Sequence, residues 1–434
     1  MRFDQDKKGN FMANCFYGAD ILLPKFREDK EKMNKWATIA CDQYTSEPDY
    51  WNEVENVVGD NPSALRVTLP EIYLEEGDTA ERISKINATM SDYTENVLES
   101  FADTQIYLER KLADGRVRHG LIGMIDLEEY DYNKGADTLV RATEGTVLER
   151  IPPRVEIRRG ADIELPHVMM LIDDREKSVI EPLTAKKESF ERAYSFTLMQ
   201  NGGEVEGYFV DTKSKEQVAK ALEKLCDIDE YNKKYGTNEK KPMLFAVGDG
   251  NHSLASAKAL YGEIKQKLGE TAKNHPARYA LVEIVNIHDA ALEFEPIYRV
   301  IFECETAKVM SALKVYAQEN KGGENSFEIE CVGATVNEKV MIKNSKEELA
   351  VGALQKFIDE YLKENSGYVD YIHGIDSTKT LTSKEKAIGF LFDGMGKDEL
   401  FKSVIVGGSL PRKTFSMGEA HDKRYYLEAR KIVK

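Results

Sequence analysis

The sequence has few of the features that mark secreted, membrane-spanning or nucleic-acid-binding proteins. Its 434 residues include five cysteines and no CxxC pair, so neither a zinc site nor a disulfide framework is predicted. The N-terminus lacks the apolar stretch of a signal peptide, and no window approaches the roughly 18 apolar residues of a membrane span. Lys and Arg number 60 against 76 Asp and Glu, and the net charge of −16 weighs against nucleic acid or anionic membranes as partners. These absences predict a cytoplasmic protein that binds neither nucleic acid nor membrane.

The composition is that of an ordinary globular protein, with 41% hydrophobic and 31% charged residues. At about 150 residues per domain, the length predicts two or three domains. Strand and helix patterns are mixed without the steady alternation of a doubly wound sheet, which favours an α+β (mixed α/β) fold. We expect a core over residues 10–303, an inserted subdomain over 304–380, and a C-terminal segment over 381–434 that returns to the core.

Local patterns predict several elements. Apolar residues recur at helical spacing over 80–101 and 214–226, and Pro48 is typical of a helix start. Two strands joined by Asp114 and Gly115 are expected over 104–126. Further strands are expected over 279–287, 297–302, 388–392 and 404–406, and a loop over 232–242.

Residues 243–268 predict a strand, a tight polar loop and a helix. The first turn of such a helix directs several N–H groups to one place, which suits an anion, and Gly248 and Gly250 let the backbone approach a phosphate closely. Asp249 is a candidate ligand for a divalent cation, and His252 a candidate hydrogen-bond donor or proton relay. The alternative is that Gly250 and Asn251 only turn the chain and that Asn251 or Ser253 caps the helix. The loop is not a Walker motif, because no Gly-Lys-Ser/Thr follows.

Other polar residues are weaker candidates. In an extended segment Arg154, Glu156 and Arg158 would share one face, although a solvated face neutralised by Glu156 is the alternative. Asp42, in the loop after a short apolar run, is a candidate base or metal ligand. Five histidines show no metal-ligand spacing and are expected to be structural or exposed: His167, His275, His288, His373 and His421.

Residues 246–253 (AVGDGNHS) resemble the Ala-Asp-Gly-His-His-Arg motif of a widespread prokaryotic family, domain of unknown function 1015. That family is related to the ParB and sulfiredoxin-like superfamily, so the resemblance implies a core of that fold with a mixed sheet and an additional C-terminal subdomain. Further segments are similar to family segments in the same order: residues 40–44 to Pro-Tyr-Asp, 65–71 to Val-Arg-Leu-Asp-Leu-Pro, 144–146 to Glu-Arg-Thr, 294–299 to Pro-Thr-His-Arg, and 410–414 to Pro-Pro-Lys-Ser-Thr.

The resemblance implies a nucleotide phosphate near residues 248–253. This chain has Asn251 for the first His of the motif and Ser253 for its Arg, which removes a positive charge expected to face the phosphate. The candidate replacements are Arg150, Arg154, Arg158 and Lys413, the last together with Arg412. Glu144 matches a family position that implies a general base, with a surface carboxylate as the alternative.

Together these observations predict a Mg-dependent phosphotransferase that uses ATP or ADP and acts on a small hydroxyl metabolite. The resemblance makes free serine the most specific acceptor. Asp249 would bind Mg, and Glu144 or Asp42 would accept the hydroxyl proton. The alternatives are a ParB-like nucleotide-binding switch and a degenerate member that binds a ligand without catalysis. Sulfiredoxin chemistry is disfavoured, because the place of the catalytic cysteine is taken by Asn251 and Cys41 lies outside the loop.

Overall fold

The computed structural model describes residues 15–74, 76–145, 151–319 and 321–434. The chain divides into two compact units. Unit 1 comprises Met1–Ala142, Thr146–Leu292 and Glu419–Lys434, and unit 2 comprises Thr143–Gly145 and Glu293–Gly418. Unit 2 therefore begins before residue 304 and extends well beyond residue 380, and only the segment from Glu419 returns to unit 1.

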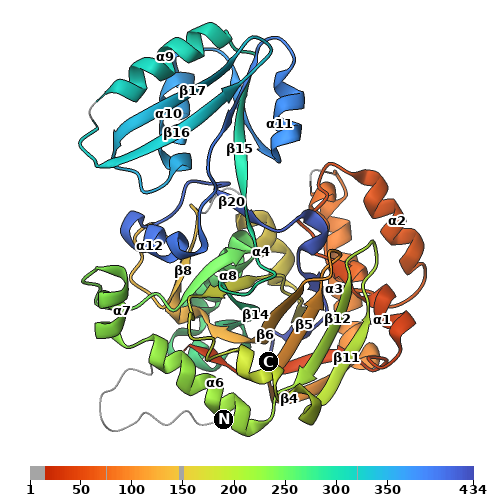
Figure 1. Cartoon of the computed structure of the whole chain (residues 1–434). Coiled ribbons are helices and arrows are strands. Elements are labelled where there is room, and N and C mark those ends of the chain that lie inside the picture. Colours follow the sequence, from red (N-terminus) through yellow and green to blue (C-terminus); the bar gives the residue numbers. More distant parts are fainter. Residues whose placement is uncertain (1–14, 75, 146–150, 320) are drawn as a thin grey trace. The chain divides into compact units, whose positions relative to one another are not determined.

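Unit 1 contains the larger set of elements (Figure 1). Its helices are α1 (Lys30–Trp36), α2 (Pro48–Val58), α3 (Thr79–Asp92), α4 (Ile151–Arg159), α5 (Glu181–Thr184), α6 (Thr212–Leu225), α7 (Ile228–Tyr235) and α8 (Asn251–Leu268). Its strands are β1 (Phe16–Tyr17), β2 (Ala19–Pro24), β3 (Thr38–Ile39), β4 (Leu98–Thr104), β5 (Ile106–Lys111), β6 (Val117–Asp126), β7 (Tyr130–Asp131), β8 (Val140–Ala142), β9 (Ile163–Glu164), β10 (Met169–Ile172), β11 (Glu191–Thr197), β12 (Glu204–Phe209), β13 (Phe245–Asp249), β14 (Tyr279–Asn286), β21 (Tyr425–Tyr426) and β22 (Ala429–Lys431).

Unit 2 is built around one sheet (Figure 1). Its helices are α9 (Thr306–Gln318), α10 (Ala350–Glu364), α11 (Ile375–Thr382) and α12 (Lys397–Gly407). Its strands are β15 (Phe294–Phe302), β16 (Asn325–Val332), β17 (Asn337–Ser345), β18 (Tyr368–His373), β19 (Ala387–Leu391) and β20 (Phe415–Met417). The sheet has the order β17-β16-β19-β15-β18, and β20 pairs with β15.

The main sheet of unit 1 has the order β11-β12-β5-β6-β14-β10-β13-β8-β7, with β1 paired to β6. It is a mixed sheet, because β10 runs parallel to β14 but antiparallel to β13. Both faces are buried. In β5, Ile106 and Leu108 join one apolar core, whereas Tyr107 joins the other, as expected from the period of two along a strand. The mixed α/β fold predicted from the sequence is confirmed.

Strand pairing brings together four segments that are far apart in the sequence: the residues after β13, those before β10, residues 41–42 and residue 423. Asp249, at the carboxyl end of β13, pairs with Met169 at the amino end of β10, so the loop after β13 lies beside the segment that precedes β10. In a separate two-stranded ladder, Tyr425 of β21 pairs with Ile39 of β3. The N–H of Ala40 also donates to the carbonyl of Arg424, at 2.9 Å, which extends this pairing toward residues 41–42 and 423.

Most of the predicted elements are confirmed. The DG-linked strands are β5 and β6, paired antiparallel. The helix expected over 80–101 is α3, which is followed by β4, and the helix starting at Pro48 is α2. The strand–loop–helix over 243–268 is β13 and α8.

Three local predictions are wrong, one of them only in part. Residues 404–406 lie in α12, where Leu400, Phe401 and Val404 are buried at helical spacing. The loop expected over 232–242 is wrong for residues 232–235, which lie in α7, and right for the stretch that follows the left-handed Gly236. The segment 151–159 is the helix α4 rather than an extended strand. Its two prolines follow Ile151 directly, and proline is favoured in a first helical turn because its φ is already near the helical value.

Among the described residues, no helix is both long enough and apolar enough to cross a membrane.

Candidate functional site

The loop between β13 and α8 has the geometry of an anion-binding helix start. Gly250 is the N-cap of α8, with φ of 78° in the left-handed region. It offers no side-chain hydrogen bond to the first turn, so the early N–H groups have no cap from the N-cap residue. The alternative in which Asn251 or Ser253 caps the helix is wrong, because both lie inside α8. This arrangement suits a phosphate or carboxylate ligand.

Both the backbone conformation and the close packing around residue 250 require glycine there. A Cβ built there would lie 3.0 Å from Cα and 3.1 Å from Cγ2 of Val168, and 3.4 Å from Cδ2 of His167. We expect Gly250→Ala to lower the free energy of unfolding by about 1–3 kcal/mol, since it combines a left-handed φ with a crowded contact.

Urea unfolding followed by tryptophan fluorescence measures this effect, because Trp36 and Trp51 both lie in unit 1. Gly262→Ala in the same helix is the matched control. A Cβ at Gly262 meets no atom of the described residues within 4 Å, so this change should stabilise by about 0.5–1 kcal/mol. Equal effects of the two substitutions would contradict the prediction.

Asp249 is held at the loop by a cation from the end of the chain. Its Oδ2 lies 3.2 Å from Nζ of Lys423, and its Oδ1 accepts the N–H of Gly250 at 2.9 Å. The Lys423 side chain is 11% exposed. The Asp249 carboxylate therefore faces the Lys423 ammonium group next to the first residues of α8.

Asp42 belongs to the same cluster. Its Oδ2 lies 3.6 Å from Nε2 of His167, and Nδ1 of His167 is 2.8 Å from the hydroxyl of Tyr426. Burial raises the pKa of Asp42, but His167, the amide of Gln43 and Lys423 lower it by more, so the pKa lies below its ordinary value. Asp42 is thus an ionised carboxylate at neutral pH.

Cys41 is not an activated thiol. Burial, with the nearby Asp42 and Glu71 carboxylates, raises its pKa to about 12. Its N–H donates to the Tyr426 hydroxyl at 3.2 Å, which ties the Asp42 loop to β21. Because the thiolate is the nucleophile in cysteine chemistry, this environment makes Cys41 a poor nucleophile.

The other predicted loop residues lie at the start of α8. Asn251 is buried, and its Oδ1 has no hydrogen-bond partner among the described residues. The carbonyl of His252 accepts the hydroxyl of Ser256 at 2.7 Å, and Ser253 is half-buried. Gly248 is the penultimate residue of β13.

The candidate arginines that the structure describes, Arg154 and Arg158, both pair with carboxylates of unit 1. Arg154 forms an ion pair with Glu71. Arg158 lies 2.5 Å from Glu164, which also pairs with Arg430. Arg150 lies outside the described residues. These contacts give Arg154 and Arg158 structural partners inside unit 1.

Two predicted residues come together in unit 2. Oε2 of Glu144 accepts the N–H of Lys413 at 2.9 Å, and Lys413 has a left-handed φ of 56°. The fully buried Arg299 donates to the carbonyls of Arg412, at 3.0 Å, and Lys413, at 2.8 Å. The structure thus confines Glu144 and Lys413 to one small hydrogen-bonded group.

Sequence reasoning missed three residues of the unit 1 cluster: His167, Lys423 and Tyr426. His167 was expected to be structural or exposed, and the motif match ended before residue 423. Nothing in the local pattern around 423–426 distinguishes it from an ordinary charged segment followed by a short strand. The pairing of β21 with β3 helps to bring this segment to the site.

The described residues could supply only some of the ligands that a magnesium ion needs. Among the described residues, no three His, Cys, Asp or Glu side chains cluster so that they could hold a metal ion. Mg²⁺ in nucleotide sites is commonly held by one or two carboxylates together with substrate phosphates. Asp249 fits that carboxylate role.

The fold and the site define a mixed α/β protein with a glycine-containing loop at a helix start. The chain belongs to the family described as protein of unknown function (DUF1015), whose model matches residues 23–395. No match was found among curated proteins.

Three solved structures are among those that match this chain. A free serine kinase in complex with AMP is 13% identical, with a TM-score of 0.36 over 71% of this chain and 90% of that one. A conserved hypothetical protein from Pyrococcus furiosus is 15% identical, with a TM-score of 0.32 over 71% and 94%. SbnI with a C-terminal truncation, from Staphylococcus aureus, is 9% identical, with a TM-score of 0.35 over 68% and 82%. Scores in this range do not establish a shared fold, and the ParB and sulfiredoxin-like relationship stays a prediction.

Proposed function

We propose that this protein is a nucleotide-dependent phosphotransferase that acts on a small hydroxyl metabolite, with free L-serine as the most specific acceptor. The observation that carries the proposal is the uncapped start of α8, where Asp249 and Lys423 meet beside the Asp42–His167 pair. The choice of serine comes from the family resemblance of residues 246–253.

The helix start would hold the nucleotide phosphates. The N–H groups of its first turn and the positive end of the helix dipole attract negative charge, and Gly250 lets the backbone approach the ligand closely. Asp42 and Asp249 are two carboxylates against the single ammonium of Lys423, so the site suits a phosphate that arrives with a divalent cation. Bound Mg²⁺ would offset phosphate charge there, with Asp249 as its protein ligand.

The transfer step moves one phosphoryl group and one proton. The acceptor hydroxyl oxygen forms a bond to the terminal phosphorus, and the bond from that phosphorus to the bridging oxygen of the nucleotide breaks. ATP thus yields ADP, or ADP yields AMP, together with a phosphate monoester. Asp42 is ionised and would accept the hydroxyl proton.

The experiment is a phosphorus NMR and mass-spectrometric assay of the full chain. It contains Mg²⁺, ATP or ADP, and a mixture of serine and other small hydroxyl metabolites. We expect a new phosphate monoester from the wild type and from Asp60→Asn, the same substitution at an exposed position. Asp249→Asn should make none, while its tryptophan fluorescence shows that unit 1 is folded.

The outcomes separate the candidate functions. If no monoester forms while calorimetry shows nucleotide binding, the transferase proposal fails in favour of a nucleotide-binding switch or a degenerate binder. If no nucleotide binds at all, the assignment of residues 248–253 to phosphate binding fails as well.

A further inference from the structure

We propose that Lys423 supplies the positive charge that faces nucleotide phosphate at the start of α8, and that the C-terminal segment Glu419–Lys434 is therefore part of the binding site. The inference rests on the proposed function. It assigns a phosphate-binding role to a residue that lies outside the family match, which ends at residue 395.

The ammonium group of Lys423 is placed where a phosphate would bind. It lies 3.2 Å from Oδ2 of Asp249, whose neighbour Gly250 is the N-cap of α8. It also lies close enough to Asp42 to help lower the pKa of that carboxyl. An ammonium carries three N–H donors, so Lys423 can contact Asp249 and still donate to a ligand.

The other cations considered for this role have different partners. Arg154 pairs with Glu71, and Arg158 pairs with Glu164. Lys413 belongs to unit 2, where its N–H contacts Glu144. Among Arg154, Arg158, Lys413 and Lys423, it is Lys423 that contacts the carboxylate of Asp249.

A buried group of arginines holds the backbone that carries Lys423. Arg110 donates to the carbonyls of His421, at 2.7 Å, and Asp422, at 3.3 Å. Arg118, directly opposite Arg110 on the neighbouring strand, also donates to the Asp422 carbonyl, at 3.0 Å. These bonds fix the backbone immediately before Lys423.

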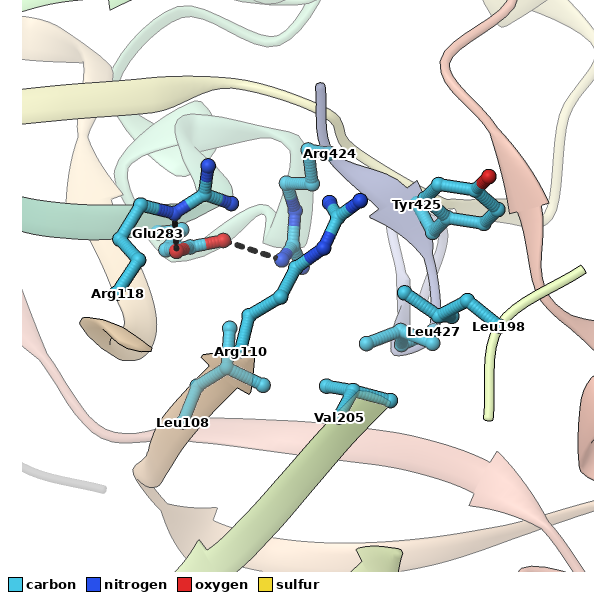
Figure 2. A pocket seen from close by; sticks show the side chains of 9 residues that line it. All are labelled: Leu108, Arg110, Arg118, Leu198, Val205, Glu283, Arg424, Tyr425 and Leu427. Atoms are coloured by element: carbon cyan, nitrogen blue, oxygen red, sulfur yellow. Dashed lines mark hydrogen bonds and ion pairs between the residues drawn. The ribbon is translucent and has the colours of Figure 1, made fainter. Parts of the chain in front are cut away.

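Arg424 completes the attachment on the other side of Lys423. It donates to Glu283 of β14 at 2.7 Å and to the carbonyl of Pro166 at 3.1 Å, immediately before His167. Figure 2 shows Arg110, Arg118 and Arg424 gathered near Glu283, beside Tyr425 of β21. These contacts hold the backbone on both sides of Lys423, so less of this segment has to be ordered when a ligand binds.

The test compares binding of Mg-ADP, inorganic pyrophosphate and adenosine by calorimetry. We expect Lys423→Met and Lys423→Gln to weaken Mg-ADP and pyrophosphate binding about 10–100-fold, as loss of a charge-assisted hydrogen bond does. Adenosine carries no phosphate, so its affinity should not change. Lys423→Arg should keep most of the affinity, and Lys431→Met, at an exposed position of the same segment, should keep all of it.

The controls distinguish this inference from the proposal beneath it. If the wild type binds Mg-ADP and the folded Lys423→Met and Lys423→Gln variants bind it equally well, the role of Lys423 is overturned and the proposed function stands. Equal losses for adenosine and Mg-ADP would also overturn it, since they indicate a structural effect. If the wild type binds neither Mg-ADP nor pyrophosphate, the proposed function itself fails.

Discussion

Arg424→Met should lower the free energy of unfolding of unit 1 by about 3–5 kcal/mol, the usual cost of removing one partner from a buried ion pair. Arg424 is 2% exposed and contacts two fully buried carboxylates, Glu283 at 2.7 Å and Glu428 at 2.5 Å. Burial alone would lower the pKa of Arg424, but the two carboxylates raise it above the ordinary value. The guanidinium therefore stays charged, and its loss leaves a carboxylate in the core without its cation.

Two further variants test this explanation. Glu283 also has Arg118 at 3.8 Å, whereas Glu428 loses its cation and keeps the hydroxyl of Tyr194. The double variant Arg424→Met with Glu428→Gln should therefore be more stable than Arg424→Met alone, because no unpaired carboxylate remains at position 428.

Arg159→Met provides the surface comparison. Arg159 is 44% exposed and pairs with Glu156 and Glu263, so its removal should cost less than about 1 kcal/mol. Urea unfolding followed by tryptophan fluorescence measures all three variants. A loss at Arg424 as small as the loss at Arg159 would show that the buried network does not stabilise unit 1.

Asp42→Asn should reduce phosphoryl transfer about 10²–10⁴-fold, the usual range for loss of a general base. The amide keeps the size of the carboxylate but cannot accept the proton of the acceptor hydroxyl. The measurement is turnover of the acceptor identified in the phosphorus NMR assay, with Asp60→Asn as the control. Unchanged turnover in Asp42→Asn would contradict the role of Asp42 as the proton acceptor.

The pH dependence of Asp42 follows from its lowered pKa. Burial opposes the shift, but His167, Gln43 and Lys423 outweigh it, so the carboxyl remains ionised down to a lower pH in the folded than in the unfolded chain. Its contribution to stability is present above the unfolded value of about 3.9 and is lost as the pH falls through the folded pKa. Turnover should consequently show no loss from Asp42 protonation between about pH 5 and 8.

The strand, loop and helix of residues 243–268 were predictable because their signals are local. An apolar run, two glycines and a helical repeat of apolar residues lie within one short segment, and each follows from backbone preference and burial. The same holds for the strands joined at Asp114 and Gly115, which pair as expected. The prediction of α4 failed because alternating charges can be read with period two, although the prolines of its first turn indicate a helix.

Only some residues of the candidate site could be predicted from the sequence. Asp42 and Asp249 were found from the sequence, whereas His167 and Lys423 were not. The contact between His167 and Tyr426 joins residues 259 positions apart, and the Arg154–Glu71 pair spans 83 positions. No periodicity or motif in a single sequence records such a pairing.

By itself the sequence determined the mixed α/β class, the strand-to-helix junction within residues 243–268 and two carboxylates of the candidate site, because these depend on neighbouring residues and on a motif. The tertiary structure alone decided which cation faces Asp249, which arginines have carboxylate partners, and where the chain returns to unit 1. The physical reason is that ion pairs and strand ladders between distant segments depend on how the whole chain packs. Their energies arise from burial and geometry that exist only once the β3–β21 ladder and the main sheet have formed.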